Sequence, residues 1–161
     1  MQLNTSAYWI NHLNLQPHPE GGFYKEIFRS GIAVSRDSLQ KQACTSIYYL
    51  LEGKDYSGFH RLASDEIWYF HKGAPLHIHA INGDSTYILH ELSDNDTGAL
   101  SVVIEAGLWF AAEIPSGEGF TLVSCAVAPG FEFAEFEMGE HDAMIKLYPH
   151  HSDLLGRLCR K

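Results

Sequence analysis

The sequence predicts an all-β fold, a sandwich or barrel with short helices at both ends of the chain. From Gly22 onward, short runs rich in aromatic and β-branched residues are separated by clusters of Gly, Asp, Asn and Ser. These clusters recur at intervals of about 8 to 12 residues, which is typical of β-sandwiches and barrels. With 161 residues, 45% of them hydrophobic, the chain is also long enough to bury a core.

Helices are expected only at the two ends. Ser6 can cap a helix that ends before Pro17, and after Gly139 the β pattern gives way to two short helical segments, 142–148 and 152–158. The expected organisation is one domain with a helix at 5–14, a barrel at about 20–138 and a helical tail at 140–161.

Ten strands are expected between these helices. The turn Asn82-Gly83-Asp84 is the strongest hairpin signal, because Asn and Gly tolerate the positive φ that a tight turn requires. The expected strands are 22–30, 43–52, 56–60, 64–71, 75–81, 86–92, 100–104, 108–113, 119–127 and 131–137.

Charge and cysteine content restrict the partners and the compartment. The chain has 20 Asp and Glu against 11 Lys and Arg, a formal charge of -9, so nucleic acid is not an expected partner. Three cysteines without paired spacing favour a reducing, cytoplasmic environment. No apolar run approaches the roughly 18 residues of a membrane helix, so no membrane partner is expected.

The stretch 53–73 carries a pattern with chemical meaning. Side chains alternate along strands, so His60 and Leu62 share one face of a strand, and Glu66 and Trp68 share one face of the next. Folded as a hairpin, the two strands place His60 opposite Glu66 inside the barrel. A buried carboxylate beside an imidazole makes either half of a metal site or an acid–base pair.

Four motifs in order resemble one family. They are His18-Pro19-Glu20-Gly21-Gly22, the segment 60–68, the segment 107–112 and the segment 127–133. They are similar to the fifth numbered family of the cupin superfamily, described as a domain of unknown function, and the resemblance covers about residues 13–136. It implies a double-stranded β-helix, or jelly roll, that forms a homodimer and binds a small molecule at the barrel mouth.

The resemblance leaves the cofactor open. The usual cupin metal set of three histidines and one glutamate becomes His60, Leu62, Glu66 and Phe110 in this chain. Two protein ligands hold a divalent ion weakly. No cofactor is therefore clearly implied, and a divalent metal at His60 and Glu66 is one alternative.

Metal-independent proton transfer is the leading interpretation. Metal-free sugar-nucleotide epimerases share the jelly roll, and they take a proton next to a carbonyl with a barrel histidine and return one from a tyrosine. By that analogy His60 is the base, Glu66 orients it, and Tyr48 or Tyr49 is the acid. The ligand is then sugar-like or keto-acid-like. The alternatives are a metal-binding enzyme and a non-catalytic binding or structural barrel.

Other residues are candidates for ligand binding. The turn at His18–Gly22 can bring Glu20 and Lys25 to the pocket, although turn chemistry alone accounts for its prolines and glycines. Aromatic side chains in the cavity suit a flat or partly apolar ligand. The aromatic candidates are Trp68, Phe70, Phe110, Phe131 and Phe133.

A second His-x-His pattern, His77 and His79, is assigned to the outside of the barrel. Leu76, Ile78 and Ala80 alternate with the two histidines and form the natural inward face. Both histidines are therefore expected to face solvent or a dimer contact.

Overall fold

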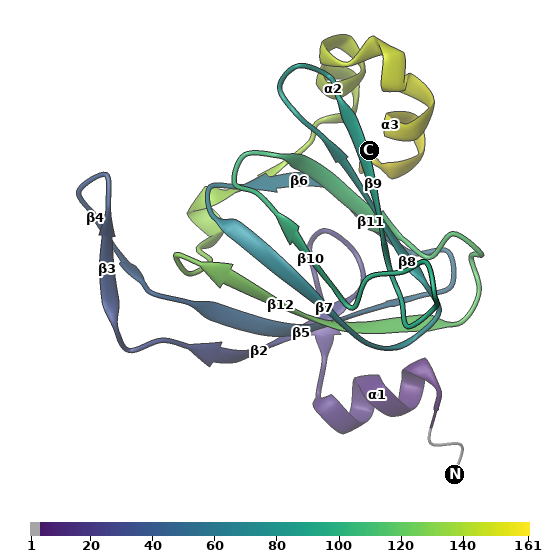
Figure 1. The fold of residues 1–161 in the computed structure, drawn as a ribbon, viewed down its shortest axis with the longest axis horizontal. Coiled ribbons are helices and arrows are strands. Elements are labelled where there is room, and N and C mark those ends of the chain that lie inside the picture. Colours follow the sequence, from purple (N-terminus) through teal and green to yellow (C-terminus); the bar gives the residue numbers. More distant parts are fainter. Residues whose placement is uncertain (1–3) are drawn as a thin grey trace.

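The computed structural model describes residues 4–161 and contains two antiparallel sheets that face each other (Figure 1). One sheet has six strands in the order β1-β2-β5-β12-β7-β10, and the other has five in the order β13-β6-β11-β8-β9. Strands β3 and β4 form a separate two-stranded arm. The predicted all-β jelly roll with helical ends is confirmed.

Nine of the ten predicted strands are present at nearly the predicted positions, and among residues 4–161 the structure adds β1, β3 and β4. In chain order they are α1 (Ser6–Leu13), β1 (Gln16–Pro17), β2 (Phe23–Arg29), β3 (Ala33–Arg36), β4 (Leu39–Gln42), β5 (Thr45–Glu52), β6 (Tyr56–Leu62), β7 (Asp65–Gly73), β8 (Leu76–Ile81), β9 (Tyr87–Leu92), β10 (Ser101–Ile104), β11 (Trp109–Glu113), β12 (Phe120–Ala128), η1 (Phe133–Glu135), β13 (Phe136–Met138), α2 (His141–Leu147), η2 (Pro149–His151) and α3 (Ser152–Leu158).

The core lies between the two sheets. It is built from inward-facing residues of both, such as Trp68 and Val123 from the six-stranded sheet and Ile78 and Phe110 from the five-stranded sheet. These side chains are at most 1% exposed. Strand alternation therefore sends one set of side chains into the barrel and the other set to its outer faces.

Both outer faces are partly covered by helices. Helix α1 packs Trp9 and Ile10 near Leu50 of β5, on the outside of the six-stranded sheet. Helices α2 and α3 pack Met144 and Leu155 against the outside of the five-stranded sheet. The two terminal segments thus bury apolar side chains that a bare barrel exposes to water.

The cap of helix α1 lies one residue earlier than predicted, and the helix begins at Ser6 itself. Thr5, not Ser6, is the N-cap, and its side chain accepts a hydrogen bond from the backbone amide of Tyr8 at 3.2 Å. The helix ends at Leu13, and Asn14 follows in the left-handed conformation with φ 54°.

The predicted β8–β9 hairpin forms, but its turn is wider than expected. Positive φ falls on Ser85, at 66°, and not on Asn82 or Gly83. The Asn82 side chain accepts hydrogen bonds from the amides of Asp84 and Thr86, so it organises a longer loop in place of a two-residue turn.

Three parts of the strand prediction were wrong. The two-residue strand β1, which pairs with β2, was not predicted. The arm, β3 and β4, was missed because its polar side chains give no alternating apolar pattern. The expected strand 131–137 is instead the 3-10 turn η1 followed by β13, which pairs with β6. This turn places several aromatic side chains above the cavity described below.

The assignment of His79 to the exposed surface was also wrong. Leu76, Ile78 and Ala80 do face the core, as predicted, and His79 points to the other side of the sheet. However, His79 is only 5% exposed there. Its Nδ1 lies 2.8 Å from the Tyr87 hydroxyl and its Nε2 lies 3.0 Å from the Glu113 carboxylate.

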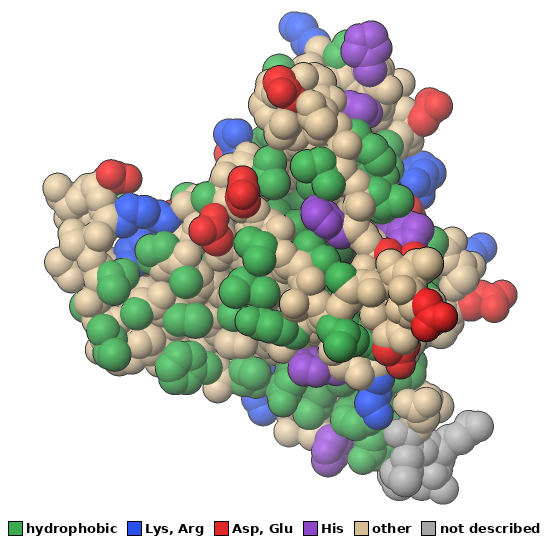
Figure 2. Space-filling view, in the orientation of Figure 1, with side chains coloured by type: hydrophobic (Ala, Val, Ile, Leu, Met, Phe, Trp, Pro, Cys, Tyr) green, Lys and Arg blue, Asp and Glu red, His purple; other side chains and the backbone are tan. Residues whose placement is uncertain are grey.

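Apolar side chains gather on the arm and over the neighbouring strands (Figure 2). Phe28, Ile32 and Leu39 are all more than half exposed. No helix among residues 4–161 is both long enough and apolar enough to cross a membrane. The homodimer stays a prediction.

Docking of the helical tail is testable with one core substitution. Leu155 of α3 is fully buried against the five-stranded sheet, so Leu155→Ala should lower the free energy of unfolding by about 2–5 kcal/mol. Leu147→Ala, at a position 60% exposed, is the control and should change it by less than about 0.5 kcal/mol. Urea denaturation measures both. Equal effects of the two substitutions would contradict the packing of the tail.

Candidate functional site

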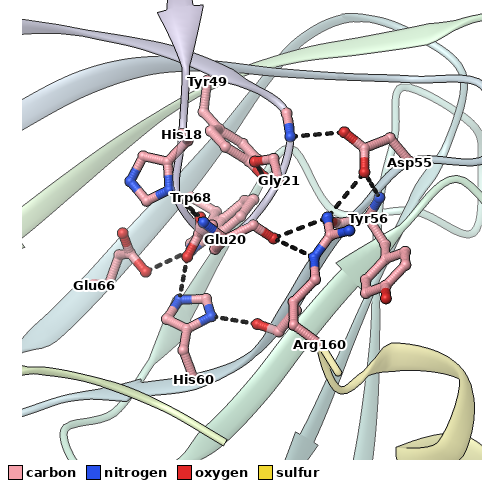
Figure 3. A network of polar contacts seen from close by, with 12 residues as sticks. His18, Glu20, Gly21, Tyr49, Asp55, Tyr56, His60, Glu66, Trp68 and Arg160 are labelled. Atoms are coloured by element: carbon pink, nitrogen blue, oxygen red, sulfur yellow. Dashed lines mark hydrogen bonds and ion pairs between the residues drawn. The ribbon is translucent and has the colours of Figure 1, made fainter.

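A cavity of about 150 Å³ opens between the two sheets. Its polar lining includes His18 and Glu20 from the turn before β2, His60 from β6 and Glu66 from β7. Figure 3 shows these four side chains pointing toward one another. They come from three separate segments of the chain, which the facing sheets bring together.

The centre of the group is an ion pair between Glu20 and His60. The His60 Nε2 atom lies 2.9 Å from the Glu20 carboxylate, and Nδ1 lies 2.7 Å from the Gly58 carbonyl oxygen. Both side chains are at most 6% exposed. Since each ring nitrogen faces an acceptor, the ring carries both protons and is an imidazolium.

The pKa values of this pair move in the directions that stabilise the charged forms. Burial opposes the imidazolium, but the Glu20 carboxylate raises the pKa of His60 above its usual value. Burial likewise opposes the carboxylate, but His60 lowers the pKa of Glu20. Each partner therefore favours the charged form of the other, and the two charges cancel.

Glu66 behaves differently from Glu20. Burial raises the pKa of Glu66 to about 7, while the charge on His60 acts in the opposite direction. One carboxylate oxygen, Oε2, accepts a hydrogen bond from Trp68 Nε1 at 3.0 Å. At neutral pH Glu66 is therefore present in both protonation states, as a general acid or base requires.

The turn from His18 to Gly22 delivers Glu20 to the cavity. His18 Nδ1 accepts a hydrogen bond from the Glu20 amide at 3.1 Å, which fits the neutral imidazole that burial favours by lowering the pKa of His18. Gly21 has φ 109°, and a Cβ there would overlap the Tyr56 carbonyl oxygen. Glycine is thus required at this position.

Arg160, after helix α3, fixes the same turn from the other end of the chain. Its guanidinium donates to the Glu20 carbonyl oxygen, at 3.2 Å from Nε and 3.1 Å from Nη2, and to Asp55 at 2.9 Å. Asp55 in turn accepts from the Gly22 amide at 2.8 Å. The Glu20 backbone is therefore held on both sides.

His60 and Glu66 both lie in the cavity, but their strands do not form the predicted hairpin. Strand β6 pairs with β11 and β13, whereas β7 pairs with β12 and β10 in the other sheet. The two strands face each other across the barrel, and both side chains point inward. The hydrogen-bond partner of His60 is Glu20 and not Glu66.

The predicted tyrosines do not line this cavity. The Tyr49 hydroxyl is buried and donates to the Gly21 carbonyl oxygen at 2.6 Å, so it supports the turn. Tyr48 faces the opposite side of the sheet and packs with the α1 cluster. The tyrosine in the lining is Tyr24, whose ring centre lies 4.5 Å from that of His18.

Of the other ligand-binding candidates, Glu20, Phe131 and Phe133 line the cavity. Trp68, Phe70 and Phe110 pack in the core, where Phe110 lies against His60 with ring centres 4.2 Å apart. Lys25 is exposed and lies next to Tyr48 in the register, away from the cavity.

Sequence reasoning missed two features of the site. The pairing of Glu20 with His60 was not predicted, although the His-Pro-Glu-Gly-Gly motif marked the turn that carries Glu20. Arg160 gave no signal, because it is a single residue after the last predicted helix. Phe136 lay in the expected strand 131–137, but nothing in the sequence set it apart as a cavity residue.

The residues present do not fit a cupin metal ion. Leu62 and Phe110 occupy two of the usual ligand positions, and both nitrogens of His60 face protein acceptors. Among residues 4–161, no three His, Cys, Asp or Glu side chains are arranged to hold a metal. The function proposed for this cavity therefore uses no metal ion.

The two facing sheets and the polar cavity between them define a cupin. The chain belongs to the family described as Cupin superfamily (DUF985), whose profile matches residues 7–139. The predicted family is thus confirmed.

Solved structures agree with this assignment. A hypothetical protein from Leishmania major is 32% identical, with a TM-score of 0.92 over 98% of this chain and 100% of that one. A protein from Shewanella oneidensis is 34% identical, with a TM-score of 0.91 over 99% of each chain. Oxalate decarboxylase from Lactobacillus farciminis, 13% identical, shares the fold at a TM-score of 0.57 over 91% of this chain and 42% of its own. No match was found among curated proteins.

The contribution of Arg160 can be measured against a neighbour on the same segment. Arg160→Ala should lower the free energy of unfolding by about 1–3 kcal/mol, because it leaves the Glu20 carbonyl and Asp55 without charge-assisted donors. Arg157→Ala removes a more exposed pair with Glu113 and should cost less than about 1 kcal/mol. Urea denaturation compares them, and a larger effect at Arg157 would refute the assigned role of Arg160.

The raised pKa of Glu66 predicts a specific pH dependence of stability. The folded state holds the Glu66 proton up to about pH 7, whereas the unfolded chain releases it near the ordinary glutamate pKa of 4.5. The folded state therefore binds more protons between these values, and stability falls as the pH rises through this window.

Replacing Glu66 by glutamine removes this dependence. Between about pH 5 and about pH 8, the wild type should lose roughly 2–3 kcal/mol more unfolding free energy than Glu66→Gln. Glu105→Gln, at an exposed position, is the control and should follow the wild type. Identical pH profiles for wild type and Glu66→Gln in urea denaturation would show that the Glu66 pKa is not raised.

Proposed function

We propose that this cupin binds a small organic molecule in the cavity and moves a proton on a carbon next to a carbonyl group. The observation that carries the proposal is Glu66, a buried carboxyl group with a pKa of about 7 on the cavity wall. A general acid or base works best when its pKa lies near the working pH.

Glu66 is the proton carrier in this proposal. As a carboxylate it takes the proton from the carbon, and the electron pair of the C–H bond forms the carbon–carbon double bond of an enolate. The electron pair of the carbonyl double bond moves to the oxygen at the same time. The protonated Glu66 then returns the proton to the same carbon, which exchanges its hydrogen with solvent. Where that carbon carries a hydroxyl group that passes its proton to the enolate oxygen, the proton returns instead to the former carbonyl carbon. The net result is then isomerisation, in which the carbonyl group moves to the adjacent carbon and the ligand as a whole is neither oxidised nor reduced.

The Glu20–His60 pair has a supporting electrostatic role. The sequence analogy made His60 the base, but its ring nitrogens are both hydrogen-bonded, to Glu20 and to Gly58. A fixed imidazolium across the cavity from Glu66 instead supplies positive charge for the enolate oxygen. This charge is preorganised, because the pair is buried and held before any ligand enters.

The charges in the cavity favour one of the two ligand classes that the resemblance suggests. Sugar-like and keto-acid-like molecules both carry a carbonyl with an adjacent C–H bond. A keto acid also carries a carboxylate, which would lie near Glu20 and Glu66 without an added cation. The proposal therefore favours the ligand without a negative charge.

Deuterium exchange tests the proposal without knowledge of the natural substrate. Hydroxyacetone, aminoacetone and pyruvate are incubated separately with the protein in heavy water, and loss of their C–H signals is followed by NMR. Wild-type protein should accelerate exchange in at least one of them, with a rate that rises through about pH 7 as Glu66 ionises.

The variants make the test specific to the cavity. Glu66→Gln should lose the acceleration, roughly a hundredfold or more, while Tyr48→Phe, on the opposite face of the sheet, should retain it. Absence of acceleration for all three compounds, or full acceleration by Glu66→Gln, would overturn the proposal in favour of a non-catalytic binding barrel.

A further inference from the structure

The cavity has a surplus of negative charge. Four carboxylates line it, from Glu20, Glu26, Glu66 and Glu132. The one arginine in the lining, Arg29, already donates to Glu26 at 2.9 Å and to Glu132 at 3.1 Å. His60 is paired with Glu20 in the same way.

Within residues 4–161 the lining itself holds no further cation, although Lys41 beside it attracts the Glu132 carboxylate. Among the described residues, the lining contains no lysine, and Lys25 faces away from it. His18 is kept neutral by its burial. An incoming anion would thus find the cations already paired and would be repelled by carboxylate charge that has no paired cation. An incoming cation would instead be attracted by carboxylate oxygens.

Another part of the cavity lining, next to His60, is aromatic. The rings of Phe131, Phe133 and Phe136 lie with their centres 4.9 to 6.3 Å apart and with planes 69° to 81° to one another. Their faces therefore point in different directions, as in a corner. His18 lies 6.5 Å from Phe133 and 6.2 Å from Phe136, and extends the wall.

Phe133 is half exposed although it lies in this corner. It is 53% accessible to solvent and sits on η1, directly before β13. An exposed aromatic ring at a cavity mouth gains apolar contact when a ligand covers it. Aromatic faces combined with carboxylates are the combination that recognises organic cations through cation–π and charge attraction.

We infer that the cavity selects a ligand with an organic ammonium group, which the Phe131, Phe133 and Phe136 corner holds against the surplus carboxylates. The inference rests on the proposal that this cavity is the substrate site, and it names the substrate class. Combined with the proton chemistry, it points to a small amino-carbonyl compound. The carbonyl lies toward Glu66 and His60, and the ammonium group lies toward the aromatic corner.

A series of probes that differ in charge tests the inference. Choline is compared with its neutral isostere, in which carbon replaces the quaternary nitrogen, and with the tert-butylacetate anion, which has a similar size. Isothermal titration calorimetry at neutral pH should give a Kd for choline on the order of tenfold or more below that of the neutral isostere. The anion should bind more weakly still.

Two phenylalanine variants of equal exposure locate the binding site. Phe133→Ala should weaken choline binding by roughly tenfold, while Phe28→Ala, at a ring that is 54% exposed but outside the cavity, should leave it unchanged. Circular dichroism confirms that both variants are folded. The inference is overturned if choline does not bind, if either analogue binds as tightly, or if Phe28→Ala has the same effect as Phe133→Ala.

The two proposals fail separately. Choline selectivity without any deuterium exchange would remove the proton-transfer function and leave the ammonium site. In the converse result, deuterium exchange depends on Glu66 and yet is fastest with pyruvate, while choline shows no selective binding. That result would support the proton-transfer function and contradict the ammonium site.

Discussion

The Glu20–His60 ion pair lies buried between the two sheets, and the polar half of the cavity is organised around it. Taking two charges out of water costs several kcal/mol per ion, and their attraction repays this only when the geometry is close and the remaining polar atoms are satisfied. Gly58 satisfies the second ring nitrogen, and the turn through Gly21 holds the carboxylate in place. Such a pair is a costly way to stabilise a barrel, so its presence favours a role in chemistry.

Burial sets the environment of Glu66. Leu62 and Phe110 stand at two positions where the usual cupin metal set has histidines, and in this barrel Leu62 lines the cavity and Phe110 packs against His60. Apolar surroundings disfavour a carboxylate, and burial is the main reason that the pKa of Glu66 is raised. A cupin barrel without the full set of metal ligands can therefore present a glutamate of that set as a proton carrier.

Much of this structure follows from local sequence, and the rest follows from contacts that local sequence does not encode. Strand alternation placed Ile78 in the core and His60 in the barrel, because a two-residue period needs no knowledge of the partner strand. Strand pairing could not be derived in this way, so β6 and β7 were assigned to one hairpin although they lie in opposite sheets. For the same reason the partner of His60 was taken as Glu66, its neighbour in sequence, and not as Glu20.

The clamp by Arg160 also ties the geometry of the site to the docking of the helical tail. The strands of both sheets end at Met138, and Arg160 follows the last helix, so the donor to the Glu20 carbonyl oxygen comes from outside the barrel. A local opening that lifts α3 from the five-stranded sheet would remove this donor while the strand pairing of the barrel stays intact. The barrel fixes where Glu20 lies, and the tail fixes how firmly its turn is held.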